Sequence, residues 1–136
     1  MENVDYTSTF ITVAPDTSAV AGVEPSGSTI AATTFSLIAS APYSLRSSDV
    51  IFQVWATRHD VDPSSADEWA AFYSTSHACL RSSDLGKRYG WGIHADADGR
   101  LAVYAVGSDA YASLAAGVAP DGSPVTAKPA MRSSRR

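Results

Sequence analysis

Cysteine is almost missing from this sequence, since Cys79 is the single one among 136 residues. One thiol excludes an internal disulfide and any metal site built from several cysteines. Long apolar runs are missing too, because no stretch reaches the roughly 18–20 apolar residues that a membrane-spanning helix needs. The opening MENVDYTSTF also lacks the basic and apolar regions of a signal peptide. We therefore expect a cytoplasmic protein without membrane contact, metal or cofactor.

Positive charge is in deficit: 10 Lys and Arg stand against 14 Asp and Glu, which gives a net charge of −4 at pH 7. Nonspecific binding to nucleic acid or to acidic lipid requires a net basic face. The charge balance therefore argues against both kinds of partner. The cations that are present gather in two places, the cluster Arg81, Lys87 and Arg88 and a basic tail at residues 128–136.

Length and composition indicate one domain. A chain of 136 residues with 45 % hydrophobic and 18 % charged residues falls in the range of ordinary globular domains. Residues 14–28 are rich in Pro, Gly, Ser and Ala and are expected to form a loop. We place a single domain at residues 1–127 and a basic C-terminal tail at residues 128–136.

Three helices are predicted from capping and spacing. Phe35 and Ile38 fall on one helical face. Ser65 and Glu68 have the spacing of a capping box, in which each side chain bonds the backbone of the other residue. Ser108 is a preferred N-cap residue for the last helix. The predicted helices span residues 30–40, 65–74 and 108–116.

Four strands are predicted from β-branched and aromatic residues. The strongest is the run VIFQVWAT, whose two alternating faces are both mostly apolar, as is typical of a central strand covered on both sides. The last two strands form a hairpin around Gly99, which fits the left-handed position of a three-residue loop. That loop sets the register, with Ile93 opposite Val103 and His94 opposite Ala102. The predicted strands span residues 6–13, 50–57, 89–95 and 101–106.

Helices and strands therefore interleave in the order β-α-β-α-β-β-α, and residues 117–136 leave room for a short terminal strand before the basic tail. The tight hairpin within this order favours antiparallel pairing, whereas the interleaving leaves room for parallel neighbours. We predict an α+β fold, a single compact domain with a mainly antiparallel or mixed sheet and about three helices.

One face of the first hairpin strand carries almost no side chains. Gly90, Gly92 and His94 share this face, because side chains alternate along a strand. A structural interpretation is that a helix packs close there, or that the ring of Tyr104 covers Gly92. A functional interpretation is that a ligand approaches the bare backbone beside His94. The sequence leaves both interpretations open.

A cluster of cations precedes this strand. Arg81, Lys87 and Arg88 surround a short turn, and arginine side chains together with turn N–H groups can hold a carboxylate or phosphate. The spacing is not that of a P-loop. The same residues also fit a solvated surface on which Arg81 pairs with Asp84.

Cys79 and His94 are candidate catalytic residues, because a nucleophilic thiolate needs a base within hydrogen-bond reach. The neighbouring cations would favour the thiolate form of Cys79, and His77 is another candidate base. A single cysteine is also commonly a small buried hydrophobe. No spacing of His and Cys matches a structural zinc site, so no metal ligand is predicted.

The segment CLRSSDLGKRYGWGIH at residues 79–94 is the most distinctive of the chain. Through it the chain resembles a family of small uncharacterised proteins, mostly bacterial, that form a domain of unknown function. The resemblance covers nearly the whole chain and supports the domain boundaries, but it implies no activity, substrate or cofactor. The further matching segments are residues 6–14, 41–43, 47–54, 101–104, 108–111 and 130–133.

Three functional hypotheses follow. The first is a binding module for a small anionic ligand at the turn and strand of residues 79–94. The second is a hydrolase or transferase that uses Cys79 as nucleophile and a histidine as base. The third is a structural or partner-binding protein that docks through its basic tail. The candidate ligand-binding residues of the first hypothesis are Arg81, Lys87, Arg88, His94 and Tyr104.

Overall fold

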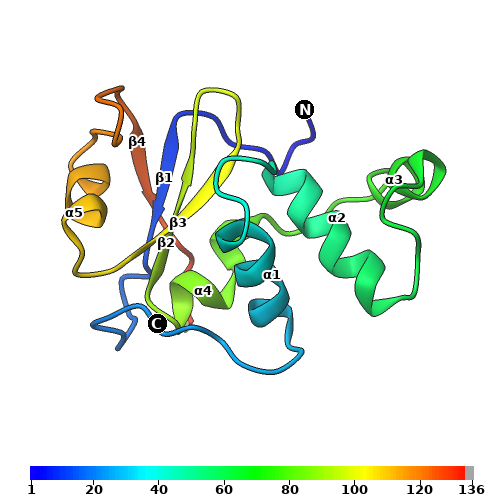
Figure 1. Cartoon of the computed structure of the whole chain (residues 1–136), viewed down its shortest axis with the longest axis horizontal. Helices are drawn as coiled ribbons and strands as arrows, with labels where there is room; N and C mark the ends of the chain where they lie inside the picture. The colour runs from blue at the N-terminus through cyan, green and yellow to red at the C-terminus, as the bar shows by residue number, and fades with distance from the viewer. Residues whose placement is uncertain (134–136) are drawn as a thin grey trace.

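The computed structural model describes residues 1–133, which form a four-stranded sheet with helices on both faces (Figure 1). The strand order is β3-β2-β1-β4. β1 (Thr9–Thr12) lies inside the sheet, antiparallel to β2 (Trp91–Ala95) and parallel to β4 (Thr126–Pro129). β3 (Leu101–Ala105) forms the other edge and is antiparallel to β2. The predicted α+β class and mixed sheet are confirmed.

The helices form a layer on each face of the sheet (Figure 1). In chain order they are α1 (Ile30–Ala39), α2 (Ser47–Arg58), α3 (Ala66–Phe72), the 3-10 turn η1 (Leu80–Ser82), α4 (Asp84–Lys87) and α5 (Asp109–Ala115). α1, α2 and α4 lie on one side of the sheet, α5 lies on the other, and α3 lies beyond α2 at one end of the molecule (Figure 1). The described residues therefore contain five α-helices where about three were predicted. None of these helices is long and apolar enough to cross a membrane.

The hairpin has the predicted register. Ile93 pairs with Val103 and His94 pairs with Ala102. Gly99 adopts the left-handed conformation with φ of 85°, and its N–H donates to the carbonyl of Asp96 at 3.0 Å. The turn chemistry of a few neighbouring residues was therefore sufficient to predict this part of the sheet.

The prediction of a strand at residues 50–57 is wrong, because this segment lies within helix α2. Val50 and Val54 are one helical turn apart and pack toward the sheet, whereas Phe52 and Ala56 pack toward α3. A helix that is buried on two opposite sides places apolar residues at every second position and so imitates a strand.

The start of α2 is fixed by two carboxylates. Asp49 accepts a hydrogen bond from the N–H of Arg46 at 2.9 Å, within the first turn. Asp5, which is distant in the sequence, accepts from both the N–H and the hydroxyl of Ser48 at 2.8 Å each. Unpaired N–H groups at a helix N-terminus favour such negative partners. Only helices lie between β1 and β2, unlike the predicted order, whereas β4 takes the place of the terminal strand for which the sequence left room.

Three apolar clusters hold the layers together. The largest lies between the sheet and α1, α2 and α4, a second lies between the sheet and α5, and a third lies between α2 and α3. Their most deeply buried large side chains include Ile38, Ile93, Phe10, Leu114 and Phe52. The sheet therefore separates two independent packing environments.

The C-terminal segment is partly integrated into the sheet. The boundary expected after residue 127 falls inside β4, and Ala130 beyond it is only 2 % exposed. The side chain of Arg81 donates from Nε to the carbonyl of Pro129 at 2.8 Å. The last three residues of the predicted basic tail, 134–136, lie outside the described part of the chain.

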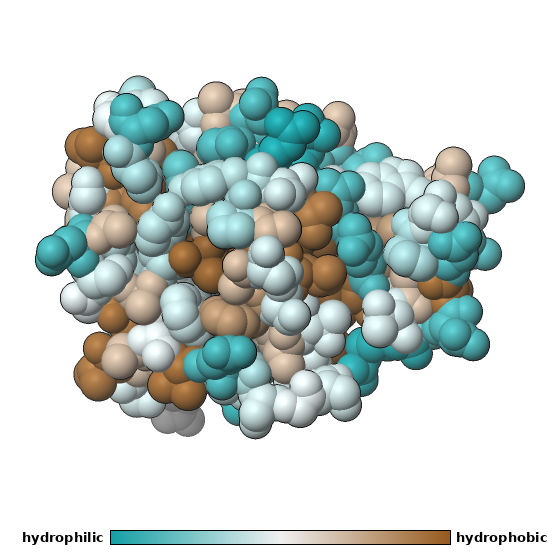
Figure 2. Space-filling view, viewed as in Figure 1, coloured by the Kyte–Doolittle hydropathy of each residue, from teal (hydrophilic) through white to brown (hydrophobic). Residues whose placement is uncertain are grey.

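The loop between β1 and α1 carries exposed apolar side chains. Val20 is 88 % exposed and Val23 is 58 % exposed. Hydrophobic atoms gather at the lower left of Figure 2, where Figure 1 draws this loop. Scattered exposed apolar residues are normal on protein surfaces, so this loop alone assigns no function.

We expect Asp5→Ala to lower the free energy of unfolding by about 1–2 kcal/mol, because it removes the cap of α2 and leaves the Ser48 N–H without its partner. Chemical denaturation followed by circular dichroism measures this loss. The matched control is Asp67→Ala in the first turn of α3, an exposed position for which we expect a loss within about 0.5 kcal/mol. Equal losses in the two variants would contradict a capping role of Asp5.

Candidate functional site

The glycine face of β2 is filled by the protein itself. A methyl group added at Gly92 would overlap the ring of Phe10 and would lie 2.8 Å from the ring of Tyr111. Phe10 and Tyr111 pack edge to face with 5.0 Å between ring centroids. The glycine therefore permits the close approach of these two rings, the second of which belongs to α5. The rings of Phe10 and Tyr111, and not that of Tyr104, are the groups that approach it most closely.

His94 lies in a buried network beside these rings. It is 4 % exposed, its Nδ1 lies 2.8 Å from the hydroxyl of Tyr43, and that hydroxyl lies 2.7 Å from the hydroxyl of Tyr104. The Nε2 atom is buried and has no hydrogen-bond partner within residues 1–133. Burial lowers the pKa of His94, although the carboxylates of Asp96 and Asp121 oppose this effect. The network therefore favours a neutral imidazole.

Tyr43 reaches this network through an uncommon backbone conformation. Its φ of 58° lies in the left-handed region, which is costly for a bulky residue. Its N–H donates to the carbonyl of Leu101 at 2.7 Å, which ties the loop after α1 to the edge strand β3. Burial, followed by the contact with Tyr104, raises the pKa of the Tyr43 hydroxyl, so this group stays protonated.

The predicted cations do not converge with His94. Arg88 Nε lies 3.6 Å from the carboxylate of Asp84, Arg81 bonds a carbonyl of β4, and Lys87 is half-exposed. The residues around these cations pack on the α1 side of the sheet, whereas His94 and Tyr104 lie on the α5 side. The sheet thus divides the candidate ligand-binding residues into two groups on opposite faces.

Cys79 has a tyrosine as its hydrogen-bonding partner. The hydroxyl of Tyr6 donates to Cys79 Sγ at 3.0 Å, and burial together with this contact raises the pKa of Tyr6 to about 12. His77 stacks on Phe72 at 3.7 Å between centroids, and its Nε2 lies 2.6 Å from the Phe72 carbonyl. No histidine in residues 1–133 is hydrogen-bonded to the thiol. A nucleophile–base pair of Cys79 with His77 or His94 is therefore not assembled.

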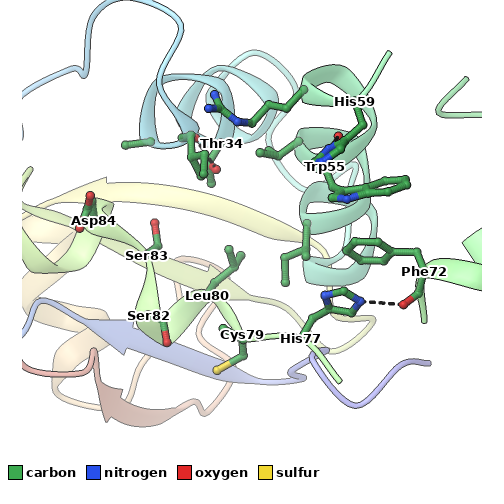
Figure 3. A pocket seen from close by; sticks show the side chains of 16 residues that line it. Thr34, Trp55, His59, Phe72, His77, Cys79, Leu80, Ser82, Ser83 and Asp84 are labelled. Carbon is green, nitrogen blue, oxygen red and sulfur yellow. Dashed lines mark hydrogen bonds between the residues drawn. The ribbon is translucent and has the colours of Figure 1, made fainter. Parts of the chain in front are cut away.

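The most developed concave site is a cavity of about 450 Å³ between α1, α2 and the segment of residues 77–84 (Figure 3). Helix α1 supplies Ile30, Ala31 and Thr34, and helix α2 supplies Ile51, Val54, Trp55 and Arg58. Leu80 of η1 projects into the space between the helices (Figure 3). The remaining lining residues are His59, Phe72, His77, Ala78, Cys79, Ser82, Ser83 and Asp84.

Aromatic rings line the α2 and α3 side of this cavity. His59 stacks on Trp55 at 4.8 Å, Trp55 lies 5.0 Å from Phe72, and Phe72 stacks on His77. In Figure 3 these four rings lie one over another along the right-hand side of the cavity. The two inner rings, Trp55 and Phe72, have their faces turned toward neighbouring rings, with a tilt of 45° between the two, so their edges are what this wall offers to the cavity.

Cys79 contributes little to the cavity itself. Its sulfur points away from Trp55 and Phe72 in Figure 3. It also borders a second cavity of about 430 Å³, which Tyr6 and the hydroxyl residues 74–76 line. His77 and Cys79 therefore stand between the two cavities. Within residues 1–133, no three His, Cys, Asp or Glu side chains cluster in a way that could hold a metal ion.

The residues of α2 that line the cavity were not predicted from the sequence. Ile51, Trp55 and Arg58 are spaced by four and three positions, which is the spacing of one helical face. That signal was present but was interpreted as the alternation of a strand. None of the predicted ligand-binding residues lines this cavity. Of the catalytic candidates, Cys79 and His77 border it and His94 does not.

Comparisons with known proteins give a family and nothing more specific. A family model described as a family of unknown function, DUF6157, matches residues 1–136. No curated protein and no solved structure was found to match the chain.

We expect Gly92→Ala to destabilise the fold by about 1–3 kcal/mol, because the added methyl group displaces the buried ring of Phe10. In a Phe10→Leu background the same change should cost less, since the smaller side chain leaves room for the methyl group. A double-mutant cycle in chemical denaturation measures this coupling. Strictly additive losses would contradict the contact between Phe10 and residue 92.

The stability of the fold should fall as the pH is lowered through the range of His94. The pKa of His94 in the folded chain lies below the ordinary value of 6.5, so the unfolded chain takes up the proton first. The contribution of the neutral His94 to the free energy of unfolding is therefore fully present above pH 6.5, the ordinary pKa, and decreases as the pH falls below that value. The free energy of unfolding, measured from about pH 7.5 to about pH 5, should decline less steeply in His94→Gln than in the natural chain.

The control for this pH dependence is His59→Gln, which alters an exposed histidine at the C-cap of α2. It should retain the decline of the natural chain. A His94→Gln variant with the same decline as His59→Gln would show that another group is responsible.

Proposed function

The chain belongs to the family of unknown function DUF6157, so its activity has to be inferred from its own surface, and we propose that it binds a small organic acid in the cavity between α1, α2 and residues 77–84. The observation that supports this proposal is one concave space in which apolar walls meet a cation that forms no ion pair with a carboxylate of residues 1–133. Such a combination of apolar walls and a few polar groups is typical of small-molecule sites.

The size of the cavity suits a small metabolite. Its volume of about 450 Å³ falls within the range of about 300–1,000 Å³ common for ligand pockets. Ala31, Ile51, Val54 and Leu80 supply apolar surface that a hydrocarbon portion of a ligand can cover. Burial of about 100 Å² of such surface contributes roughly 2–3 kcal/mol to binding before the costs of association.

The charge of the cavity favours an anion. Arg58 forms no ion pair with a carboxylate in residues 1–133, and one of its guanidinium nitrogens donates to the carbonyl of Ser28 at 3.2 Å. The remaining N–H groups are available to a ligand. The one carboxylate at the cavity, Asp84, lies beside Arg88, which partly offsets its charge. A carboxylate is the simplest ligand group that matches Arg58.

The proposal retains the first sequence hypothesis and changes its location. The ligand is still small and anionic, but Arg58 takes the role expected of Arg81, Lys87 and Arg88. The hypothesis of a Cys79 hydrolase or transferase has weaker support, because the thiol points away from the cavity and no histidine is bonded to it. The tail hypothesis rests on residues 128–136, of which the first members lie in or beside β4.

The test compares acids with their uncharged amides. Phenylacetate and cyclohexylacetate should bind saturably in calorimetry or NMR titration, and each should bind more tightly than its amide. In Arg58→Gln the affinity for the acids should fall about 2- to 5-fold, the range of an exposed charge pair, while the affinity for the amides stays unchanged.

The matched control is Arg100→Gln, which removes an arginine of the β2–β3 hairpin whose ion-pair partner, Asp98, also lies outside the cavity lining. It should leave both affinities unchanged. If neither acid binds, or if Arg100→Gln and not Arg58→Gln lowers acid affinity, binding of an acid in this cavity is refuted.

A further inference from the structure

We propose that the acid bound in this cavity is aromatic, with its ring held face-on against the ring edges of Trp55 and Phe72. This inference rests on the proposed function and adds the chemical class of the apolar portion of the ligand. It depends on the way in which the cavity wall is built from side-chain rings.

The wall offers the edges of Trp55 and Phe72, because the faces of these two rings are turned toward neighbouring rings. Trp55 lies between His59 and Phe72, with centroid distances of 4.8 and 5.0 Å. Phe72 lies in turn against His77, nearly parallel at an interplanar angle of 8°. What remains for a ligand is the row of C–H and N–H groups along the edges of these rings.

Ring edges carry partial positive charge, and ring faces carry partial negative charge. An aromatic ligand can therefore place its face on this row in an edge-to-face contact. A saturated ring of similar size fills the same volume but has no such complementary charge. The wall consequently discriminates between aromatic and aliphatic acids of the same shape and charge.

The indole N–H of Trp55 strengthens this preference. It forms no hydrogen bond within residues 1–133, in contrast to Trp69, which donates to Glu2 at 3.3 Å, and Trp91, which donates to the Val23 carbonyl at 2.9 Å. Trp55 is half-buried at the cavity wall. An unpaired N–H at an apolar wall is suited to the face of an aromatic ring.

Arg58 stands three residues after Trp55, on the neighbouring turn of α2. One helical face therefore presents both the ring edge and the cation. A carboxylate joined to an aromatic ring through a short linker matches these two groups together. Phenylacetate has this arrangement, and cyclohexylacetate is its saturated counterpart with the same charge.

The experiment is a titration of the whole chain with these two acids. In the natural chain phenylacetate should bind about 2- to 10-fold more tightly than cyclohexylacetate, the range expected from one aromatic pair. In Trp55→Leu the ratio should approach one, whereas in Trp69→Leu, which alters a tryptophan outside the cavity, it should stay as in the natural chain.

A second readout requires no folded variant. In the natural chain labelled with nitrogen-15, phenylacetate should move one indole N–H proton signal upfield through its ring current, and cyclohexylacetate should not. Equal affinities of the two acids, or an unchanged ratio in a folded Trp55→Leu, would overturn the aromatic preference and leave the proposed function intact. If neither acid binds, the proposed function itself fails.

Discussion

The hydrogen bonds that join the Asp5 carboxylate to Ser48 are the constraint on which the rest of the structure depends, because they fix where α2 begins. Each residue turns a helix by about 100°, so the starting residue decides which side chains face which neighbour. With this start, Val50 and Val54 face the sheet and Phe52 faces α3. The same phase places Trp55 and Arg58 at the cavity. Asp5, which lies near the N-terminus, therefore sets the orientation of the cavity residues Trp55 and Arg58, which are distant from it in the sequence.

The segment CLRSSDLGKRYGWGIH is compact in sequence and divided in space. Leu80 and Leu85 anchor its first half on the α1 side of the sheet, whereas His94 in its second half belongs to the α5 side. Its glycines accept other parts of the chain: Gly92 accepts the ring of Phe10, and Gly90 accepts the backbone at Ala21. The composition of this segment is therefore explained by close packing, and its cations by surface contacts such as that of Arg88 with Asp84.

Local signals in the sequence predicted the parts of the fold that local chemistry decides. The register of the hairpin followed from its turn, and Ser65 and Ser108 cap their helices as expected. Residues 50–57 were mispredicted because alternation of apolar residues fits both a strand and a helix buried on two sides. The cavity could not be predicted in the same way, since α1, α2 and residues 77–84 meet only through long-range packing. The sequence shows that aromatic residues and histidines are present at these positions, but it does not show that their rings pack against one another to form one wall of the cavity.

The parallel pairing of β1 with β4 governs when this fold can form. Thr9 pairs with Ala95 on one side and with Thr126 on the other, so β1 has no partner strand in the first two-thirds of the chain. On the ribosome, the helices α1 to α3 can form as they emerge, but β1 has to wait for residues 91–95 and then 126–129. Contacts between such distant segments are slow to close, and an unpaired apolar strand is prone to aggregation. The sheet therefore assembles only after these strands have been synthesised, and β1 has no partner strand until then.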